Sequence, residues 1–310
     1  MTTAVHQGPG DGSRAVAIGG GHGSSRTLAA LAGVVDHVTA IVTVADDGGS
    51  SGRLRRDFDV VAPGDLRMAL AALARDRDLA QLLQYRFGRG ELSGHSFGNL
   101  AIVATQDLVG GDVVAALDRL ARLLDVPGRV LPCTPTPVAL RARTADGPVS
   151  GQAAVASTPQ LEEVWLEPHD PPATPDAVAA IERADLIVLG PGSLYTSLLP
   201  NLLVPEVARS IDRARCPVVL VANLREQPGE TQGLSLEAHL DVLAPHLPGG
   251  LDVLVAHEGA APAGGGAPLE VDRAALAGRV GTVRTADLLD GSDGHDPGAL
   301  ATVFDAILRG

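Results

Sequence analysis

Short and almost wholly apolar runs recur along the chain, separated by segments that have the spacing of amphipathic helices. Apolar runs of this length are typical of strands buried on both faces of a parallel sheet. We interpret five runs as strands: 15–19, 37–45, 185–190, 217–222 and 251–256. Between the first two, Leu28, Leu31 and Ala32 lie on one helical face. This gives a βαβ unit whose strands end at the same sheet edge.

The middle of the chain has a helical pattern, which changes to strand-like alternation near residue 128. Helices are expected over 66–75, 78–86, 96–109 and 111–124, with a final helix over about 298–309. The segment 128–168 alternates and turns at Asp146-Gly147, a hairpin signal. We therefore predict one α/β domain over 15–310. Its fold is Rossmann-like and three-layered, with a mainly parallel sheet and a β-rich insertion at about 128–168.

Composition narrows the class of protein. The chain has 310 residues, 45% of them hydrophobic, but no apolar run near the roughly 18 residues of a membrane helix. Residues 1–14 lack the apolar stretch of a signal peptide, and we expect them to form a disordered leader. Cys133 and Cys216 stand far apart in apolar settings. We interpret them as free thiols of a cytoplasmic protein that does not insert into a membrane.

The charged residues exclude several kinds of chemistry. The formal net charge is −13 and every basic side chain is an arginine. Without lysine there is no Schiff base and no Walker-A lysine. The acidic balance argues against non-specific binding of nucleic acid or of an anionic membrane.

Three glycine-rich polar stretches follow predicted strands and are the candidate ligand-binding loops. They occupy 19–27, 46–56 and 190–197. Ligands of open parallel sheets bind at the carboxyl ends of the strands. Glycines let backbone N–H groups approach a phosphate, and a helix that starts near Gly23 favours an anion. A ligand-free turn is the alternative for any one loop, but three such loops together predict a site for a phosphorylated small molecule.

The first loop matches neither of the common nucleotide motifs. The third glycine of G-x-G-x-x-G falls on Ser24 when the count starts at Gly19, and on Arg26 when it starts at Gly21. A P-loop would need the missing lysine.

The second loop places two carboxylates beside small residues. Asp46 and Asp47 fit a capped turn, recognition of a ribose hydroxyl, or binding of a divalent ion. Arg53 stands close enough to neutralise a phosphate or to pair with these aspartates. Asp65 is expected to cap the following helix. His22 and His95 lack zinc-ligand spacing and are interpreted as satisfied or solvent-facing histidines.

Residues 94–98 read Gly-His-Ser-Phe-Gly, a literal G-x-S-x-G. A hydrolase nucleophile in this motif must follow a buried strand, whereas the preceding stretch is polar and interrupted by glycines. We therefore expect Ser96 or Ser93 to be a helix cap, with Asn99 in the first turn.

Several longer motifs resemble, in order, the gluconeogenesis factor (YvcK) family of bacterial proteins. This family belongs to the CofD-like group, named for 2-phospho-L-lactate transferase. The motifs are AIVTVADDGGSSGRLR, PGDLR, GHSFGNL, GRVLP, GPGSLYTSLLPNLLV and NLREQPGET. The resemblance implies a cytoplasmic CofD-like domain, needed for normal cell shape on gluconeogenic carbon sources, that binds UDP-sugars such as UDP-N-acetylglucosamine. It assigns no reaction to this branch, whereas the transferase branch uses a guanosine-diphosphate-linked donor, a deazaflavin and magnesium.

The resemblance also implies a set of ligand-binding residues. Positions that match the family's motifs are Gly20, Gly21, Gly23, Asp46, Asp47, Gly48, Gly49, Ser50, Ser51, Arg53, Asn99, Gly192, Ser193, Tyr195, Thr196 and Asn201. His22 stands in the first loop where many members have threonine, and Gly294 stands where many have arginine.

The loops predict a site for a phosphorylated small molecule, and the resemblance implies that this ligand is a UDP-sugar, bound by a regulator that requires no cofactor. In this arrangement the amides of 20–23 and 190–193 hold the diphosphate and Asp46 or Asp47 takes a hydroxyl. Arg53 neutralises charge, and Asn201 completes the pocket wall. The alternatives are a magnesium-dependent transferase with the metal at Asp46 and Asp47, and dinucleotide binding without sugar specificity. We also expect a homodimer, because α/β proteins of this size often associate, and an unidentified protein partner that reads the bound state.

Overall fold

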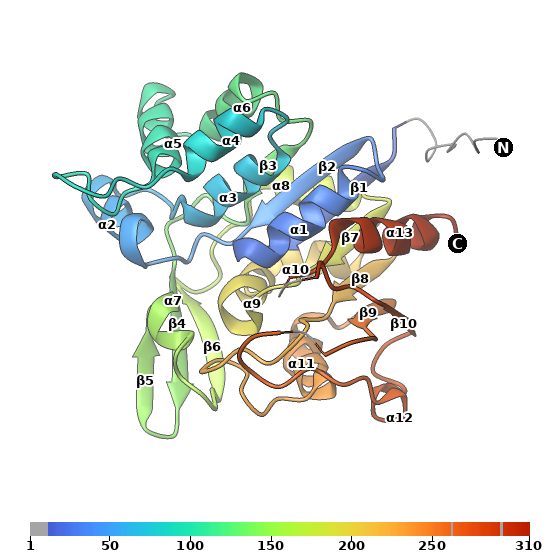
Figure 1. Ribbon diagram of the computed structural model, residues 1–310. Helices are drawn as coiled ribbons and strands as arrows, with labels where there is room; N and C mark the ends of the chain where they lie inside the picture. Colours follow the sequence, from blue (N-terminus) through green and yellow to red (C-terminus); the bar gives the residue numbers. More distant parts are fainter. Residues whose placement is uncertain (1–11, 262, 292–293) are drawn as a thin grey trace.

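A seven-stranded sheet, parallel throughout, forms the centre of the molecule (Figure 1). The computed structural model describes residues 12–261, 263–291 and 294–310, so most of the leader expected over 1–14 lies outside the described residues. In spatial order the strands are β10 (Thr282–Ala286), β9 (Val253–His257), β8 (Val218–Val221), β7 (Leu186–Leu189), β1 (Arg14–Gly19), β2 (His37–Val42) and β3 (Arg129–Pro132).

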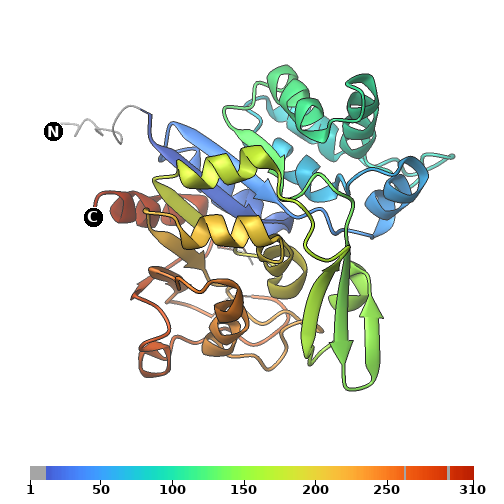
Figure 2. The same ribbon diagram turned by 180° about the vertical axis from the view of Figure 1, so that it is seen from behind.

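Helices cover both faces of this sheet and complete a three-layer α/β fold. On one face lie α1 (Gly21–Leu31), α3 (Gly64–Leu73) and α13 (Pro297–Leu308) (Figure 1). The opposite face carries α8 (Pro175–Glu182) and α10 (Pro205–Asp212), with α11 (Leu236–Leu243) nearby (Figure 2). All four residues of β7 and of β8 are buried, which explains their wholly apolar sequences. The predicted fold class is confirmed.

A helical lobe stands between β2 and β3. Besides α3 it contains α2 (Gly49–Phe58), α4 (Arg77–Gln84), α5 (Phe97–Leu108) and α6 (Val113–Leu123). Side chains at the N-caps explain where three of these helices begin, because Asp76, Ser96 and Asp112 accept first-turn N–H groups of α4, α5 and α6. Ser96 is therefore a helix cap, as the sequence predicts, and no strand precedes it.

The β-rich insertion is a three-stranded antiparallel sheet beside the main one. Its order is β5 (Gly147–Ser150), β4 (Ala139–Thr144) and β6 (Glu163–Glu167). The hairpin turns at Asp146-Gly147, where Thr144 pairs with Gly147. The expected start of the insertion at 128 differs from the structure, because β3 pairs with β2 in the main sheet.

Short helices complete the chain between these elements. They are α7 (Gln152–Val155), the π-helix η1 (Leu194–Leu198), α9 (Leu199–Leu202), the 3-10 helix η2 (Ala244–His246) and α12 (Arg273–Leu276). Among the described residues no single helix has the length and apolar character to cross a membrane; α5 and α6 pass that test only as a pair bent by 120°.

Candidate functional site

The strand order reverses between β1 and β7, and a cavity opens there. From β1 the chain proceeds outward through β2 and β3, and from β7 it proceeds the other way through β8 to β10. Such a switch point, at the carboxyl ends of the strands, is where open α/β sheets bind ligands. The cavity has a volume of about 760 Å³, within the roughly 300–1,000 Å³ range of small-molecule pockets.

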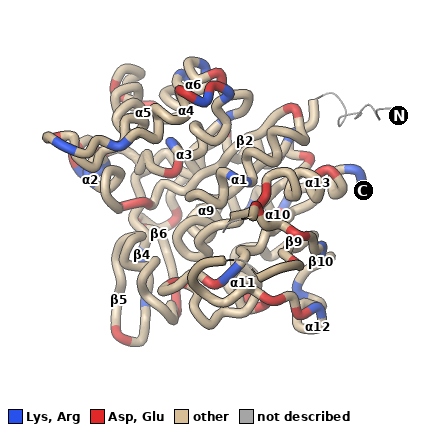
Figure 3. Tube along the Cα trace, in the orientation of Figure 1, with Lys and Arg blue, Asp and Glu red and all other residues tan. Residues whose placement is uncertain are grey.

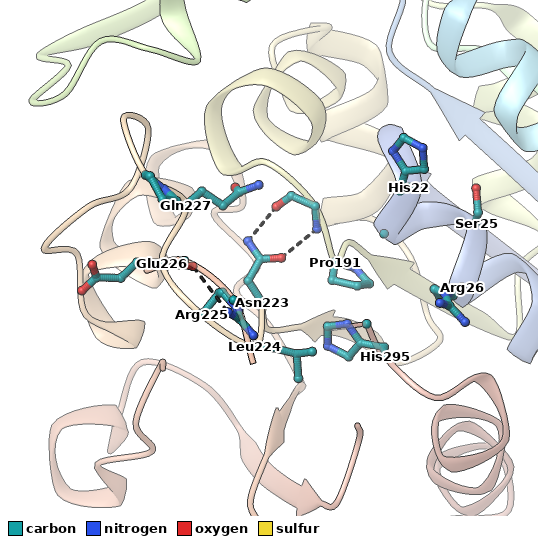
Figure 4. A pocket seen from close by; sticks show the side chains of 16 residues that line it. His22, Ser25, Arg26, Pro191, Asn223, Leu224, Arg225, Glu226, Gln227 and His295 are labelled. Atoms are coloured by element: carbon teal, nitrogen blue, oxygen red, sulfur yellow. Dashed lines mark hydrogen bonds between the residues drawn. The ribbon is translucent and has the colours of Figure 1, made fainter. Parts of the chain in front are cut away.

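Five segments of the chain line this cavity (Figure 4). The first turns of α1 form one wall and the loop after β7 forms the floor. The loop after β8 forms the opposite wall, with two short glycine-containing segments beside it. The lining residues are His22, Gly23, Ser25, Arg26, Pro191, Gly192, Asn223 to Pro228, Gly264, Gly265, Gly294 and His295.

The N-terminus of α1 borders this space, since His22 and Gly23 of its first turn line the cavity. Gly20 is the N-cap and has no side chain with which to cap the helix. The N–H groups of His22 and Gly23 lie in the first turn and have no intrahelical acceptor. Gly23 packs directly on the next loop, since a Cβ there would lie less than 3.0 Å from the Pro191 carbonyl oxygen. The N-terminus of a helix favours an anion.

Two arginines line the cavity, and they differ in their partners. Arg26 donates from Nη2 to Asp290 at 2.7 Å, so an acidic group already neutralises it. Arg225 makes one long contact, 3.5 Å from Nη1 to the Gly265 carbonyl oxygen, and its buried Nη2 has no hydrogen-bond partner among the described residues. A buried unpaired donor is costly. Among the described residues, Arg225 is therefore the cavity arginine that has no carboxylate partner.

His295 contributes a neutral imidazole to the same cavity. The ring is 6% exposed and its Nε2 lies 3.0 Å from the Ala222 carbonyl oxygen. Because that oxygen can only accept, Nε2 carries the proton and Nδ1 is left as an acceptor. Burial lowers the pKa of His295 to about 4, so the ring stays uncharged at neutral pH.

Residues that follow β8 hold the loop after β7 in place through hydrogen bonds. Asn223 accepts from the Gly192 N–H at 2.9 Å and donates to the Gly192 carbonyl oxygen at 2.8 Å (Figure 4). Gln227 donates to the Ser193 hydroxyl at 3.0 Å. The N–H of Gly192 therefore has a partner, which differs from its expected use as a diphosphate donor.

Glu230 occupies the start of the π-helix that follows. Its carboxylate accepts from the Tyr195 N–H at 3.1 Å and from the Thr196 N–H at 3.0 Å. Burial raises the pKa of Glu230, against the effect of these hydrogen bonds. Asn201 is fully buried and donates to the carbonyl oxygens of Gly19 and Ser197. Tyr195, Thr196 and Asn201 thus hold the loop in shape and do not line the cavity.

A cluster of carboxylates stands beside the cavity at the end of β2. Asp46 accepts from the Gly48 N–H at 2.8 Å, which closes a tight turn. Asp47 accepts from the Ala153 N–H at 3.1 Å and so anchors the insertion through α7. Asp65 does not cap α3, because Pro63 is the N-cap. It lies against Gly20 and accepts the Gly21 N–H instead.

Asp65 is an unusual carboxyl group. Its Oδ2 is buried and has no hydrogen-bond partner among the described residues. Burial, together with repulsion from Asp46, raises the pKa of Asp65 to about 7. A buried carboxyl beside a second carboxylate is able either to hold a proton or to share a cation with its neighbour.

Behind these carboxylates, Asn99 is the centre of a buried polar network. It accepts from Arg67 Nε at 3.0 Å and donates to the Ser50 and Ser51 hydroxyls at 3.1 and 3.4 Å. Ser50 also lies 3.1 Å from His95 Nδ1. Arg67 also donates to the side-chain oxygen of Gln84. Burial is the main cause that lowers the pKa of Arg67, and the positive charge of Arg86 lowers it further. The network fixes the start of α2 to the start of α5.

The predicted site residues therefore separate into three groups. His22, Gly23 and Gly192 line the cavity, and Gly20 and Gly21 form the N-terminus of α1 beside it. Residues of the segment after β7 form the second group: Ser193, Tyr195, Thr196 and Asn201. Asp46, Asp47, Gly48, Gly49, Ser50, Ser51, Arg53 and Asn99 belong to the neighbouring turn and network. Arg53 donates to the Ser93 carbonyl oxygen at 2.8 Å. This hydrogen bond holds the guanidinium against the loop before α5, away from the residues that line the cavity.

Sequence reasoning missed the wall formed by Asn223, Arg225 and Gln227. The available signal was their place directly after the apolar run 217–222, which is the same strand-end rule that selected the other loops. Ser25 and Arg26, which also line the cavity, lie within the predicted loop 19–27 but were not among the predicted site residues.

Comparison with known proteins agrees with this architecture. The family model described as 2-phospho-L-lactate transferase CofD matches residues 15–289. A gluconeogenesis factor of Mycobacterium tuberculosis is 47% identical over 314 residues, covering 94% of this chain and 89% of that protein. The gluconeogenesis factor of Listeria monocytogenes is 44% identical over 238 residues, covering 76% and 74%.

A solved structure extends the agreement to three dimensions. A UPF0052-family protein of Bacillus halodurans superimposes with a TM-score of 0.89 at 35% identity, covering 95% of this chain and 99% of that one. The resemblance predicted from the motifs is thus confirmed. The chain belongs to the CofD family and, within it, to the gluconeogenesis factors.

Proposed function

We propose that this protein is a cytoplasmic regulator that binds a UDP-sugar, such as UDP-N-acetylglucosamine, and supports cell shape on gluconeogenic carbon sources. The observation that supports the phosphate part is the cavity at the switch point. It is lined on one side by the first turn of α1 and on the other by Arg225, whose Nη2 has no hydrogen-bond partner among the described residues. The choice of a UDP-sugar rests on the resemblance to the gluconeogenesis factors.

In this proposal the first turn of α1 and Arg225 bind the diphosphate from opposite walls. The N–H groups of His22 and Gly23 are donors on one side, and the guanidinium supplies the opposing charge. His295 Nδ1 accepts from a hydroxyl or N–H of the ligand. The Gly192 amide is left out of this arrangement because Asn223 already binds it.

Isothermal titration tests the proposal directly. We expect UDP-N-acetylglucosamine to bind with one site per chain and to bind more tightly than uridine, which lacks the phosphates. The absence of binding by UDP-N-acetylglucosamine and UDP-glucose at millimolar concentration would refute the proposed function.

A magnesium-dependent transferase is the second candidate, favoured by Asp65. Its unpartnered Oδ2 beside Asp46 is a donor set that a hard divalent cation prefers. With magnesium bound there, the ion would offset diphosphate charge during group transfer. This candidate predicts magnesium-dependent release of a nucleoside mono- or diphosphate, abolished by Asp46→Asn. Titration without turnover favours the regulator instead.

A further inference from the structure

A groove between α1, α3 and α4 adjoins the cavity described above. Its volume is about 500 Å³, which lies within the range of small-molecule sites. His22 and Ser25 line both the cavity and the groove. The groove therefore begins at the same turn of α1 that is proposed to bind the diphosphate.

Helix α3 supplies the floor of the groove. It packs against both α1 and α4 (Figure 1), and its Met68, Ala71 and Ala72 line the groove from one helical face. The charged residues of α3 are Asp65 and Arg67, and both are buried (Figure 3). The floor is thus apolar, uncharged and made mostly of small side chains.

Helix α4 supplies the wall opposite α1. Ala80, Gln81 and Gln84 line the groove from one face of the helix, and Tyr85 follows at its end. Tyr85 is 54% exposed, and its ring packs edge-on to that of Phe87 with the centroids 5.2 Å apart. The wall therefore combines side-chain amides with an aromatic ring that a neighbour holds in place.

Gln84 offers the groove a hydrogen-bond donor whose orientation is fixed. Its Oε1 accepts from Nη1 of Arg67. A guanidinium can only donate, so the amide oxygen must face Arg67 and the Nε2 group is left as a donor. This Nε2 has no hydrogen-bond partner among the described residues. Arg67 is itself held by Asn99 at 3.0 Å, so the buried network positions the donor.

We propose that this groove binds the sugar of the nucleotide sugar and that Gln84 donates to one of the sugar oxygens. The inference rests on the proposed function, because it starts from a diphosphate at the first turn of α1. The two halves of the ligand then need separate spaces beside that turn. The cavity around Arg225 and His295 takes the nucleoside, and the groove takes the sugar.

The chemistry of the groove suits a sugar ring better than a uracil ring. A pyranose has apolar C–H faces and a rim of hydroxyl groups. The floor and Tyr85 match the former, and the amide of Gln84 and the hydroxyl of Ser25 match the latter. Uracil instead presents an N–H that needs an acceptor. The cavity holds one in Nδ1 of His295, whereas Arg67 already occupies the oxygen of Gln84.

The charge of the groove also fits an uncharged group. Arg77 is the one arginine among the residues that line it, and none of them is a carboxylate. Asp76 and Asp78 flank Arg77 in the sequence, so positive charge does not accumulate there. A second phosphate group or an acidic peptide would lack the cluster of cations that binds such groups.

Isothermal titration with UDP-N-acetylglucosamine and with UDP, which lacks the sugar, tests the proposal. Gln84→Glu keeps an acceptor for Arg67 but removes the donor. Ala72→Phe places a ring on the floor of the groove. The matched control is Ala104→Phe, which changes an exposed alanine of α5 that does not line the groove. Thermal unfolding of each variant establishes that it is folded.

We expect the wild-type chain to bind UDP-N-acetylglucosamine at least about tenfold more tightly than UDP, because the sugar adds hydrogen bonds and apolar contacts. Gln84→Glu should raise the dissociation constant for UDP-N-acetylglucosamine about three- to tenfold and leave that for UDP unchanged. Ala72→Phe should abolish the difference between the two ligands. Ala104→Phe should bind both like wild type.

The two ligands separate failure of this inference from failure of the proposed function. A wild-type chain that binds neither ligand refutes the proposed function, and the sugar site with it. Equal affinity of the wild type for UDP and UDP-N-acetylglucosamine overturns the sugar site alone. So does an equal loss of both ligands in Ala72→Phe, which would place the uridine in the groove, or unchanged binding of UDP-N-acetylglucosamine by both groove variants.

Discussion

Replacing Arg225 with glutamine removes the cation proposed to face the diphosphate. In the protein Arg225 has one long contact to Gly265, and its buried Nη2 has no partner among the described residues. Little internal bonding is therefore lost with the guanidinium. A hydrogen bond to a charged group is worth about 1.5–3 kcal/mol. We therefore expect the dissociation constant for UDP-N-acetylglucosamine to rise roughly 10- to 150-fold.

The assay is isothermal titration of wild type and Arg225→Gln with two ligands. The loss should appear with UDP-N-acetylglucosamine and be absent with uridine, because only the phosphates meet the guanidinium. Arg284→Gln, an exposed arginine of β10, is the matched control and should bind like wild type. Equal losses for both ligands would mean that Arg225 only shapes the loop, and a loss below threefold would refute the reasoning.

Three further predictions follow from the same structure. Gly23→Ala should abolish ligand binding and lower the melting temperature, because the added Cβ would collide with the Pro191 carbonyl group. Gly33→Ala is the control and should do neither, because its Cβ would lie 3.5 Å from the Ala30 carbonyl oxygen, an ordinary contact. His295 has a folded-state pKa of about 4 against an ordinary 6.5, so the unfolded state binds more protons between those values and stability falls as pH drops through that window. Urea unfolding should lose about 2 kcal/mol more between pH 7.5 and 5 in wild type than in His295→Asn, and equal losses would contradict this. Cys133 is buried with its pKa raised to about 12 by burial, so a thiol reagent at pH 7.5 should label it only after unfolding, and prompt labelling of the folded protein would contradict the described burial.

Hydrophobic patterning predicted the elements that are buried on both sides. The runs that became β1, β7, β8 and β9 are almost wholly apolar, and such runs have few alternatives in an α/β domain. The sequence did not predict β10, because Thr282–Ala286 is an edge strand whose residues are exposed or half-buried and include Arg284. Patterning also assigned β3 to the insertion, since a four-residue strand does not reveal its partner.

The candidate site was predicted less completely, for a different physical reason. Glycine loops at strand ends located the region, but hydrogen-bond partners decide which groups remain free. The N–H of Gly192 and the carboxylate of Asp47 are both engaged by residues distant in the sequence, Asn223 and Ala153. Local sequence contains no information on such pairings. That the Nη2 of Arg225 has no hydrogen-bond partner among the described residues could be seen only in the structure.

A crystal structure of the protein with UDP-N-acetylglucosamine is the measurement that tests the central claim most directly. The account predicts the diphosphate at the first turn of α1, within hydrogen-bond distance of the His22 or Gly23 N–H and of the Arg225 guanidinium. A nucleotide whose phosphates instead contact Asp46 and Asp65 through a metal ion, away from Arg225, would contradict it.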